Sequence, residues 1–349
     1  MARLRRAIAI DLGTASVLVY VNNKGVVLEE PSVIATDVLT GEILSVGSDA
    51  KKLIGRAPGN VKTTMPMQGG VIADFKATEM MLKYFLEKAT NKSLLKPDLL
   101  ICVPSRSSQV EKRAVLQASD NAGGHRTYLI EEPLAAALGA GVDISDPGGS
   151  LVIDVGGGTT DIAVIAKGLV ITSKSLDLAG LDFDKDIKDF VRKRYGILIG
   201  DQKAEEIKIK AGQLGYEKSL EVTGRSIRNG LPQKIYLPVG EVYDSIKPDL
   251  DRIVGGVKEV LEVTPPELAS DIYDRTIILT GGGSLTLGLK ERLSDKLQIE
   301  VSHAENPSRC VILGTAKALN WMDSLDEERN DAIKDKQREL EMDEKLRRR

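Results

Sequence analysis

The sequence predicts an α/β protein made of two related halves that face one shared ligand. A pattern of apolar strand, Asp-x-Gly, hydroxyl residue and second apolar strand occurs at Ala7–Tyr20 and again at Leu151–Ile165. The aspartates of the two copies, Asp11 and Asp154, are 154 − 11 = 143 residues apart, and such a repeat indicates a duplicated domain. The length of 349 residues suits two domains of ordinary size.

The turn of the second copy has the composition of a site for phosphate and a divalent cation. It consists of three glycines and two threonines, Gly156, Gly157, Gly158, Thr159 and Thr160. Glycine amides can approach phosphate oxygens closely because no Cβ atom intervenes, and the hydroxyls add donors. Asp154 and Asp161 bracket the turn and would repel phosphate unless a cation lies between them. We therefore expect a magnesium–nucleotide complex here. The alternative is a tight hairpin turn, for which one glycine would suffice.

Two further turns have related compositions. The first copy of the pattern contains Gly13, Thr14, Ala15 and Ser16. A third apolar strand, 276–280, runs into Gly281, Gly282, Gly283 and Ser284, where glycines would let the chain lie flat against a base or sugar. No Gly-Lys-Ser/Thr follows any of the three turns, which excludes a Walker loop. A strand rather than a helix follows the first two, which excludes a Rossmann fingerprint.

The first half is expected to begin with a β-meander and a further strand, after which helices and strands follow one another. The expected strands are Ile8–Tyr20, Gly25–Leu28, Ser32–Thr36, Gly41–Val46, Leu99–Pro104 and Tyr128–Ile130. The expected helices are Asp49–Ile54, Thr78–Ala89, Ser108–Ala122 and Leu134–Gly139. The last of these helices is preceded by Glu131 and Glu132, whose charges would suit the positive end of the helix dipole in any case.

The second half continues in the same manner. A strand pair is expected at Gly168–Ser175, a helix at Asp184–Tyr195, a helix at Gln202–Gly212, strands at Leu220–Ile227 and Gln233–Leu237, and a long amphipathic helix at Val239–Val263. Asn229-Gly230 is a strong turn signal between the two strands, and Thr264-Pro265-Pro266 ends the long helix. Strand Ile299–Val301 and the apolar run Cys310–Leu319 close the fold.

The bulk composition excludes several classes of protein. The apolar fraction is 42%, and 48 basic against 51 acidic residues leave a net charge of −3, so we expect no nucleic-acid partner. Cys102 and Cys310 each lie in an apolar run and are expected in the core. With no long apolar segment and no Cys/His cluster, we expect a cytoplasmic protein without a membrane span or structural zinc.

Four motifs, IDLGT, IDVGGGTTD, IEEPLAAA and LTGGGS, occur in this order, and together they resemble the actin/sugar-kinase/Hsp70 ATPase superfamily. Segments such as Glu30–Ile34 and Thr264–Leu268 are similar to the MreB family of bacterial actins. The resemblance implies an actin-like α/β fold with two ribonuclease-H-like domains, each with a smaller inserted subdomain, around a nucleotide cleft. The implied boundaries are domain I at 1–145 with its small subdomain at about 33–72, domain II at 146–322 with its small subdomain at about 182–242, a last helix at 310–322 packing back toward domain I, and a charged tail at 323–349.

The resemblance also implies roles for single residues. ATP or ADP would bind with Mg²⁺ held by Asp11 and Asp154, and Glu132 would orient the attacking water, with Glu131 in reserve. Asp154 and Thr160 would assist through hydrogen bonds. Glu205 and Lys208 would bracket the adenosine, although a solvated helix face with Glu205/Lys208 and Glu206/Lys210 pairs is the simpler interpretation. Gly314 is expected near the adenine.

Two segments suggest contacts outside the cleft. Leu94 and Leu95 lie between lysines, a pattern often found in a packed loop, but the resemblance implies an apolar loop that dips into the bilayer. Many copies in a filament would have to cooperate, because two leucines bury little area. The tail 323–349 is nearly all charged and ends in arginines, so it is a second candidate for membrane or partner contact.

The expected function is that of a slow, Mg-dependent ATPase that polymerises into filaments controlling cell shape, or shape and motility in wall-less cells. Its partners would be further copies, as paired protofilaments, the inner face of the cytoplasmic membrane, and other shape-determining proteins, so it would be peripherally membrane-associated. The alternative is a non-polymerising superfamily ATPase or small-molecule kinase. Ala15-Ser16-Val17 and Asp161 depart from the usual pattern of the family, which puts the turnover rate in question.

Overall fold

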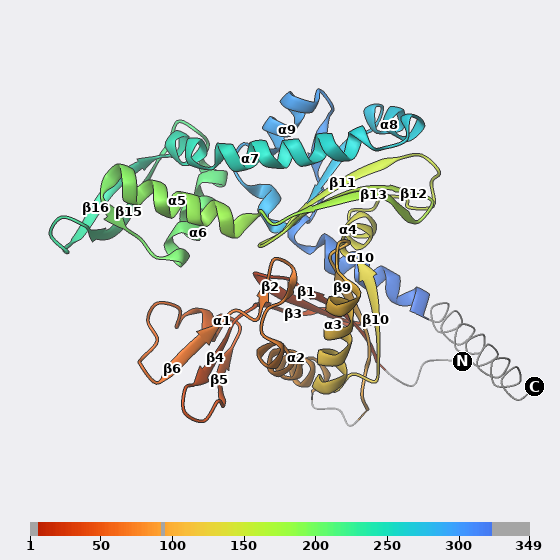
Figure 1. Ribbon diagram of the computed structural model, residues 1–349, viewed down its shortest axis with the longest axis horizontal. Helices are drawn as coiled ribbons and strands as arrows, with labels where there is room; N and C mark the ends of the chain where they lie inside the picture. Colours follow the sequence, from red (N-terminus) through yellow and green to blue (C-terminus); the bar gives the residue numbers. More distant parts are fainter. Residues whose placement is uncertain (1–5, 92–94, 323–349) are drawn as a thin grey trace, which may run out of the picture.

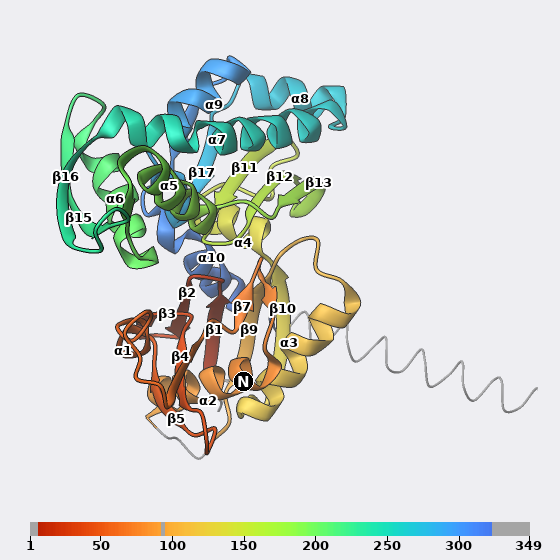
Figure 2. The same cartoon turned by 60° about the vertical axis from the view of Figure 1, so that its left-hand side comes forward.

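The computed structural model describes residues 6–91 and 95–322, which form two stacked halves (Figure 1). Leu94 and the charged tail 323–349 lie outside the described residues. Each half is built on a five-stranded mixed sheet, and small three-stranded sheets project from one side of both halves (Figures 1 and 2). Among the described residues, no helix is both long enough and apolar enough to cross a membrane.

The sheet of the first half has β1 at its centre. The spatial order is β10 (Arg126–Glu131), β9 (Asp98–Val103), β1 (Ala7–Leu12), β2 (Ser16–Val21) and β3 (Gly25–Pro31). β1 pairs in parallel with β9 and antiparallel with β2. The helices around this sheet are α2 (Phe75–Thr90), α3 (Gln109–Ala122), α4 (Glu132–Gly139) and α10 (Cys310–Ala318).

Strand β1 is buried on both faces, and its two faces carry side chains of different size. Ile8 and Ile10 belong to the cluster under α2 and α3. Ala7 and Ala9, which point to the opposite face because side chains alternate along a strand, pack with α4 and α10. Helix α4 also contacts the second sheet and packs against α10, so the two helices lie between the halves.

The sheet of the second half repeats the topology of the first. Its order is β18 (Val301–His303), β17 (Ile277–Thr280), β11 (Ser150–Val155), β12 (Thr160–Ala166) and β13 (Leu169–Leu176). β11 pairs in parallel with β17 and antiparallel with β12, as β1 does with β9 and β2. The duplication that the sequence indicates is therefore present in strand order and in strand direction.

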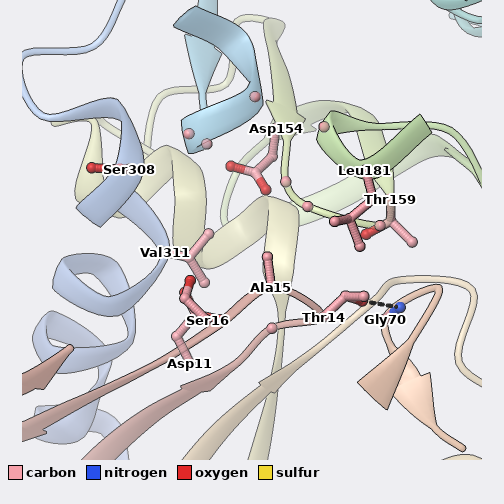
Figure 3. Close-up of a pocket in the computed structure, with 18 of the residues that line it drawn as sticks. Asp11, Thr14, Ala15, Ser16, Gly70, Asp154, Thr159, Leu181, Ser308 and Val311 are labelled. Carbon is pink, nitrogen blue, oxygen red and sulfur yellow. Dashed lines mark hydrogen bonds between the residues drawn. The ribbon is translucent and has the colours of Figure 1, made fainter. Parts of the chain in front are cut away.

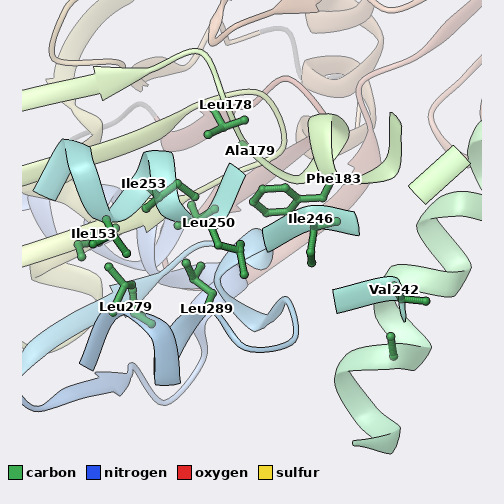
Figure 4. Packing of buried hydrophobic residues seen from close by; sticks show 14 of the residues in the cluster. Ile153, Leu178, Ala179, Phe183, Val242, Ile246, Leu250, Ile253, Leu279 and Leu289 are labelled. Atoms are coloured by element: carbon green, nitrogen blue, oxygen red, sulfur yellow. The ribbon is translucent and has the colours of Figure 1, made fainter. Parts of the chain in front are cut away.

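Helices cover the outer face of the second sheet and enclose the largest cluster of buried side chains (Figure 4). They are α5 (Gly180–Tyr195), α7 (Val239–Glu262), α8 (Pro266–Tyr273) and α9 (Leu289–Leu297). Ile246 and Leu250 of α7 lie at helical spacing and pack against Phe183 of α5, as the apolar periodicity of the sequence predicts.

Two small sheets extend the halves. One consists of β5 (Ile43–Val46), β4 (Ile34–Asp37) and β6 (Val61–Thr64) with helix α1 (Ser48–Lys51), and the other of β14 (Ile197–Leu198), β15 (Ser219–Ser226) and β16 (Pro232–Pro238) with helix α6 (Asp201–Leu214). The short elements that remain are β7 (Met67–Gln68), β8 (Val71–Ile72) and the 3₁₀ turns η1 (Gly282–Leu285), η2 (Pro307–Arg309) and η3 (Leu319–Trp321).

Several expected elements were wrong in extent, and the last strand is Val301–His303 rather than Ile299–Val301. Helix α5 begins at Gly180 rather than at Asp184, because the Asp182 carboxylate accepts a hydrogen bond from the Ala179 amide at 3.0 Å and caps an earlier first turn. Helix α1 ends at Lys51 instead of reaching Ile54. The expected strand pair after the central turn is one strand, β13. Cys102 and Cys310 are buried and free, as expected.

Candidate functional site

A cavity of about 270 Å³ lies between the two halves and receives residues from both sheets (Figure 3). Most residues that the sequence assigns to nucleotide or metal binding line it. These are Asp11, Gly13, Thr14, Ala15, Ser16, Glu132, Asp154, Gly156, Gly157, Gly158, Thr159, Glu205, Lys208, Gly281, Gly282 and Gly283. Residues that are up to 272 positions apart in the chain (283 − 11) are thus brought to one place.

The two glycine turns have the same hydrogen-bonded geometry. In the β1–β2 turn, the Gly13 amide donates to the Ser16 carbonyl at 3.0 Å. In the β11–β12 turn, the Gly156 amide donates to the Thr159 carbonyl at 2.9 Å. Each residue of the first pair is 143 positions before its counterpart, the same offset that separates Asp11 from Asp154. The repeat is therefore preserved at the level of single hydrogen bonds.

The two turns also face each other at close range. A Cβ atom at Gly157 would lie 2.4 Å from the Cβ atom of Ala15, and one at Gly158 would lie 2.7 Å from Thr14 Oγ1. Glycine is therefore required here because the opposite turn packs against it, in addition to any approach to phosphate. We call residues 13–16 and 156–159 the two clasps.

Four carboxylates are buried at the base of the clasps. They are Asp11, Glu132, Asp154 and Asp161. Burial raises the pKa of Asp154 to about 6, and burial together with the charge of Asp154 raises the pKa of Asp11 to about 7. Burial and the charge of Asp161 raise the pKa of Glu132 well above its usual range. A cation placed among these groups would favour their charged forms.

Hydrogen bonds fix two of these carboxylates. Thr280 Oγ1 donates to Asp154 Oδ1 at 2.6 Å, and Cys102 Sγ lies 3.4 Å from Asp11 Oδ1. Within residues 6–91 and 95–322, no group of three or more His, Cys, Asp or Glu side chains has the arrangement of a complete metal cage. Magnesium commonly takes only one or two carboxylates and completes its shell with water and phosphate oxygens. The pair Asp11 and Asp154 therefore fits magnesium.

The other end of the cavity contains the helix residues that were expected near the adenosine. Lys208 Nζ is 2.9 Å from Asp184 Oδ1 and donates to the Gly180 carbonyl at 2.7 Å. Glu205 pairs with Lys51 of the opposite half at 2.6 Å. The solvated pair that supported the simpler interpretation also exists, since Lys210 contacts Glu206 at 2.6 Å. Helix α6 thus has one face toward the cavity and another toward solvent.

Four candidates do not line the cavity. Thr160 is buried and donates to the Leu178 carbonyl at 2.7 Å, and Ser284 is buried and donates to the Gly281 carbonyl at 2.7 Å. Glu131 ends β10, with no side-chain hydrogen bond to cap α4. Gly314 was expected near the adenine, but a Cβ atom there would lie 1.7 Å from the Ala135 carbonyl oxygen, so its place is the crossing of α10 and α4.

The cavity also includes residues that the sequence analysis did not assign. They are Leu18, Glu29, Gly70, Gly180, Leu181, Asp184, Ile209, Pro307, Ser308 and Val311. The Gly70 amide, in the turn between β7 and β8, donates to Thr14 Oγ1 at 2.9 Å (Figure 3). Its φ of +73° favours glycine, and the only signal in the sequence is a Gly-Gly pair, which indicates a turn but not its position.

Comparison with known proteins agrees with this architecture. Residues 5–327 match the family model described as MreB/Mbl protein. The chain is 46% identical over 324 residues to the cell shape-determining protein Mbl of Bacillus subtilis, covering 92% of this chain and 97% of that protein. It is 43% identical over 325 residues to the cell shape-determining protein MreB of Escherichia coli, covering 90% and 94%.

Solved structures show the same fold. MreB5 of Spiroplasma citri bound to AMPPNP superposes with a TM-score of 0.88 at 35% identity, covering 93% of this chain and 99% of that chain. The MamK double helical filament superposes with a TM-score of 0.77 at 19% identity, covering 90% and 99%, which supports the fold alone. The fold is therefore actin-like, as the motifs predicted, and the chain belongs to the MreB/Mbl family.

Proposed function

We propose that this protein binds ATP with magnesium between its two halves, hydrolyses it slowly to ADP and phosphate, and polymerises into filaments that determine cell shape. The observation that carries the proposal is the pair of equivalent clasps that face each other above buried carboxylates. A relative of the same family, MreB5 of Spiroplasma citri, has been solved with AMPPNP and with ADP, which supports nucleotide as the ligand.

In the proposed mechanism, the amides of the two clasps donate to the β- and γ-phosphates from opposite sides. Asp11 and Asp154 would hold a hydrated magnesium ion, which when bound neutralises phosphate charge. Glu132, buried at the start of α4, orients a water toward the γ-phosphate and accepts its proton. Thr160 assists indirectly, because its hydroxyl bond to the Leu178 carbonyl fixes the end of the clasp.

Polymerisation would follow from the closure of the two halves around the ligand. We propose domains at 1–145 and 146–322, with the small subdomains at about 33–72 and 182–242, and these move as bodies about the clasps. The γ-phosphate bridges the clasps in the ATP state and is absent in the ADP state, so the two states present different surfaces to a second copy. Paired protofilaments of identical subunits are the expected assembly.

The test compares high-speed pelleting and electron microscopy without nucleotide, with MgADP and with MgATP. We expect nucleotide-dependent filaments, and we expect the Glu132→Ala protein to bind MgATP but to lose phosphate release by two orders of magnitude or more, because general-base catalysis contributes about that much. Glu131→Ala is the matched control, since Glu131 does not line the cavity.

Two outcomes would change the proposal. Absence of filaments under all conditions would remove the cytoskeletal function and leave a superfamily ATPase or kinase. Unchanged phosphate release in the Glu132→Ala protein would transfer the catalytic role to another acid. A kinase would also need a second substrate pocket with its own catalytic acid. The next pocket among the described residues is lined by Pro31, Ser48, Lys51, Lys52 and Gln202, which include no carboxylate.

We also propose peripheral attachment to the cytoplasmic face of the membrane through the loop containing Leu95. Leu95 lies between α2 and β9 and is 55% exposed, and an exposed leucine in such a loop can enter a bilayer. Its expected partner, Leu94, and the charged tail lie outside the described residues. Flotation with anionic vesicles tests this. Filaments of the Leu95→Asp protein should stay in the bottom fraction of the gradient, whereas wild-type filaments should rise with the vesicles, and flotation equal to that of the wild type would refute the attachment.

A further inference from the structure

Helix α6 carries one row of residues that connects the cavity with the opposite half. Glu205 lines the cavity, and its carboxylate accepts a hydrogen bond from Lys51 Nζ at 2.6 Å. One turn earlier, the Gln202 side-chain amide donates to the main-chain carbonyl of Lys51. One turn later, Lys208 lines the cavity. Because residues three apart lie on the same face of a helix, these three side chains of α6 form a continuous row.

Lys51 belongs to α1, beside the small sheet of the first half, whereas α6 belongs to the small sheet of the second (Figure 1). Its position is set by contacts within the first half. Ser48 donates to Glu30 Oε2 from its amide at 2.9 Å and from its hydroxyl at 2.8 Å, which ties α1 to strand β3. The contact of Lys51 with α6 therefore joins the two halves at the nucleoside end of the cavity.

The adjacent lysine has a different environment. The side chains of Lys51 and Glu205 are each 35% exposed, so their ion pair is partly shielded from solvent. Lys52 directly follows α1 and, among the described residues, forms an ion pair with Asp49 of that helix alone, and its side chain is 73% exposed. Two consecutive lysines thus differ in whether they reach the other half, which supplies a matched control.

We propose that Lys51 is a positioning residue that closes the nucleoside end of the cleft and slows the release of nucleotide. The inference rests on the proposed function, because it takes the ligand of Glu205 and Lys208 to be a nucleotide. A ligand that contacts these two side chains holds α6 in the position in which Glu205 contacts Lys51. By thermodynamic linkage, the contact between Lys51 and α6 then strengthens ligand binding by the same factor. Lys51 has this effect although it is not among the residues that line the cavity.

The experiment measures the dissociation of a fluorescent ADP analogue from the full-length protein with Mg²⁺, chased by excess ATP in a stopped-flow instrument. Lys51→Ala should release the analogue about three- to fivefold faster, the range expected for losing a partly shielded ion pair. Lys52→Ala should release it at the wild-type rate, and Lys51→Arg, which keeps the charge, should remain closer to wild type than Lys51→Ala.

A double-mutant cycle separates this role from a general loss of structure. In the Glu205→Gln background, Lys51→Ala should add less acceleration than it does in the wild type, because its charged partner is already gone. Equal acceleration in both backgrounds, or wild-type release by Lys51→Ala, would overturn the inference while leaving nucleotide binding intact. If the wild-type protein binds no nucleotide, the proposed function fails and this inference fails with it.

Discussion

At the scale of single residues, the most unusual feature is the crowding of acids beneath the clasps. Asp154 and Asp161 are directly opposite in the register of β11 and β12, so their side chains share one face of the sheet. Neither carboxylate oxygen of Asp161 has a hydrogen-bond partner among the described residues. The pKa of Asp161 is raised to about 7 by burial and by the charge of Asp154. Like charges in such positions destabilise the fold unless protons or a cation neutralise them.

We therefore predict that the ligand-free protein loses stability as pH rises from about 5 to about 7. The folded pKa values of Asp11, Asp154 and Asp161 are about 7, 6 and 7, above the ordinary value of 3.8, so in this window the folded state binds more protons than the unfolded state. Each proton of difference lowers the free energy of unfolding by about 1.4 kcal/mol per pH unit. Surface carboxylates whose pKa is lowered in the folded state change the free energy of unfolding only at pH values below this window.

Thermal unfolding between pH 5 and pH 8 measures the effect. MgADP should raise the melting temperature most at the upper end of the range, where the acids are charged and a cation relieves their repulsion. The Asp154→Asn protein should show a flatter dependence, because it lacks the charge that raises the pKa of both neighbours. A melting temperature that rises steadily from pH 5 to pH 7 without ligand would contradict the prediction.

At the scale of elements, glycines determine how closely helices can approach. A Cβ atom at Gly139 of α4 would lie 1.8 Å from the Cys310 carbonyl oxygen, and one at Gly314 of α10 would lie 1.7 Å from the Ala135 carbonyl oxygen. The two helices thus pack backbone against backbone between the sheets. This contact supports both halves, and it explains why Gly314 is not in the cavity.

We predict that Gly314→Ala destabilises the protein by about 3 kcal/mol, since a methyl group cannot enter this crossing without moving a helix. Gly255→Ala, in the interior of α7, should instead stabilise it by about 0.5–1 kcal/mol, because nothing lies within 4 Å of the added Cβ atom and alanine favours the helix. Urea unfolding of the two proteins measures the difference. Equal stability of the Gly314→Ala and wild-type proteins would show that the crossing can relax.

At the scale of the whole molecule, the halves are joined by side chains far apart in sequence. Arg106 forms an ion pair with Asp177 and donates to the carbonyl of Gly69 at 3.3 Å, directly before Gly70, which lines the cavity. Arg309 donates to Glu29 at 2.7 Å, across 280 residues of chain. With the pair of Lys51 and Glu205, these contacts join the two halves, and Glu29 and Glu205 also line the cavity, so a ligand that bridges the clasps should affect both halves together.

Hydrogen exchange tests this coupling. On addition of MgADP or MgAMPPNP, we predict slower exchange in residues 13–16 and 156–159 in parallel, together with the Gly70 amide, which is bonded to Thr14. Helix α8, which does not line the cavity, is the internal control and should be unchanged. Protection confined to one clasp would mean that the ligand does not bridge the halves, and the closure mechanism would then be wrong.

Much of this architecture could be predicted from the sequence, because the signals are local. The apolar row Val242, Ile246 and Leu250 predicted α7, and the pair Asn229-Gly230 predicted the turn between β15 and β16. The repeated Asp-x-Gly pattern predicted the two equivalent clasps. Each depends on the spacing of residues within one or two elements. The ends of elements were less predictable. Helix α5 begins at Gly180, because the Asp182 side chain caps its first turn, whereas the sequence pattern predicted a start at Asp184.

The sequence by itself determined the two-half α/β plan, the order of its strands and helices, and the residue types gathered at the cavity, since backbone freedom and apolar periodicity act over short stretches of chain. Only the tertiary structure decided that Gly314 belongs to a helix crossing, that Asp161 is buried without a hydrogen-bond partner among the described residues, and that Lys51 rather than Lys52 reaches Glu205. Those facts depend on the positions of groups brought together from distant parts of the chain, where a shift of a few ångströms changes the partner.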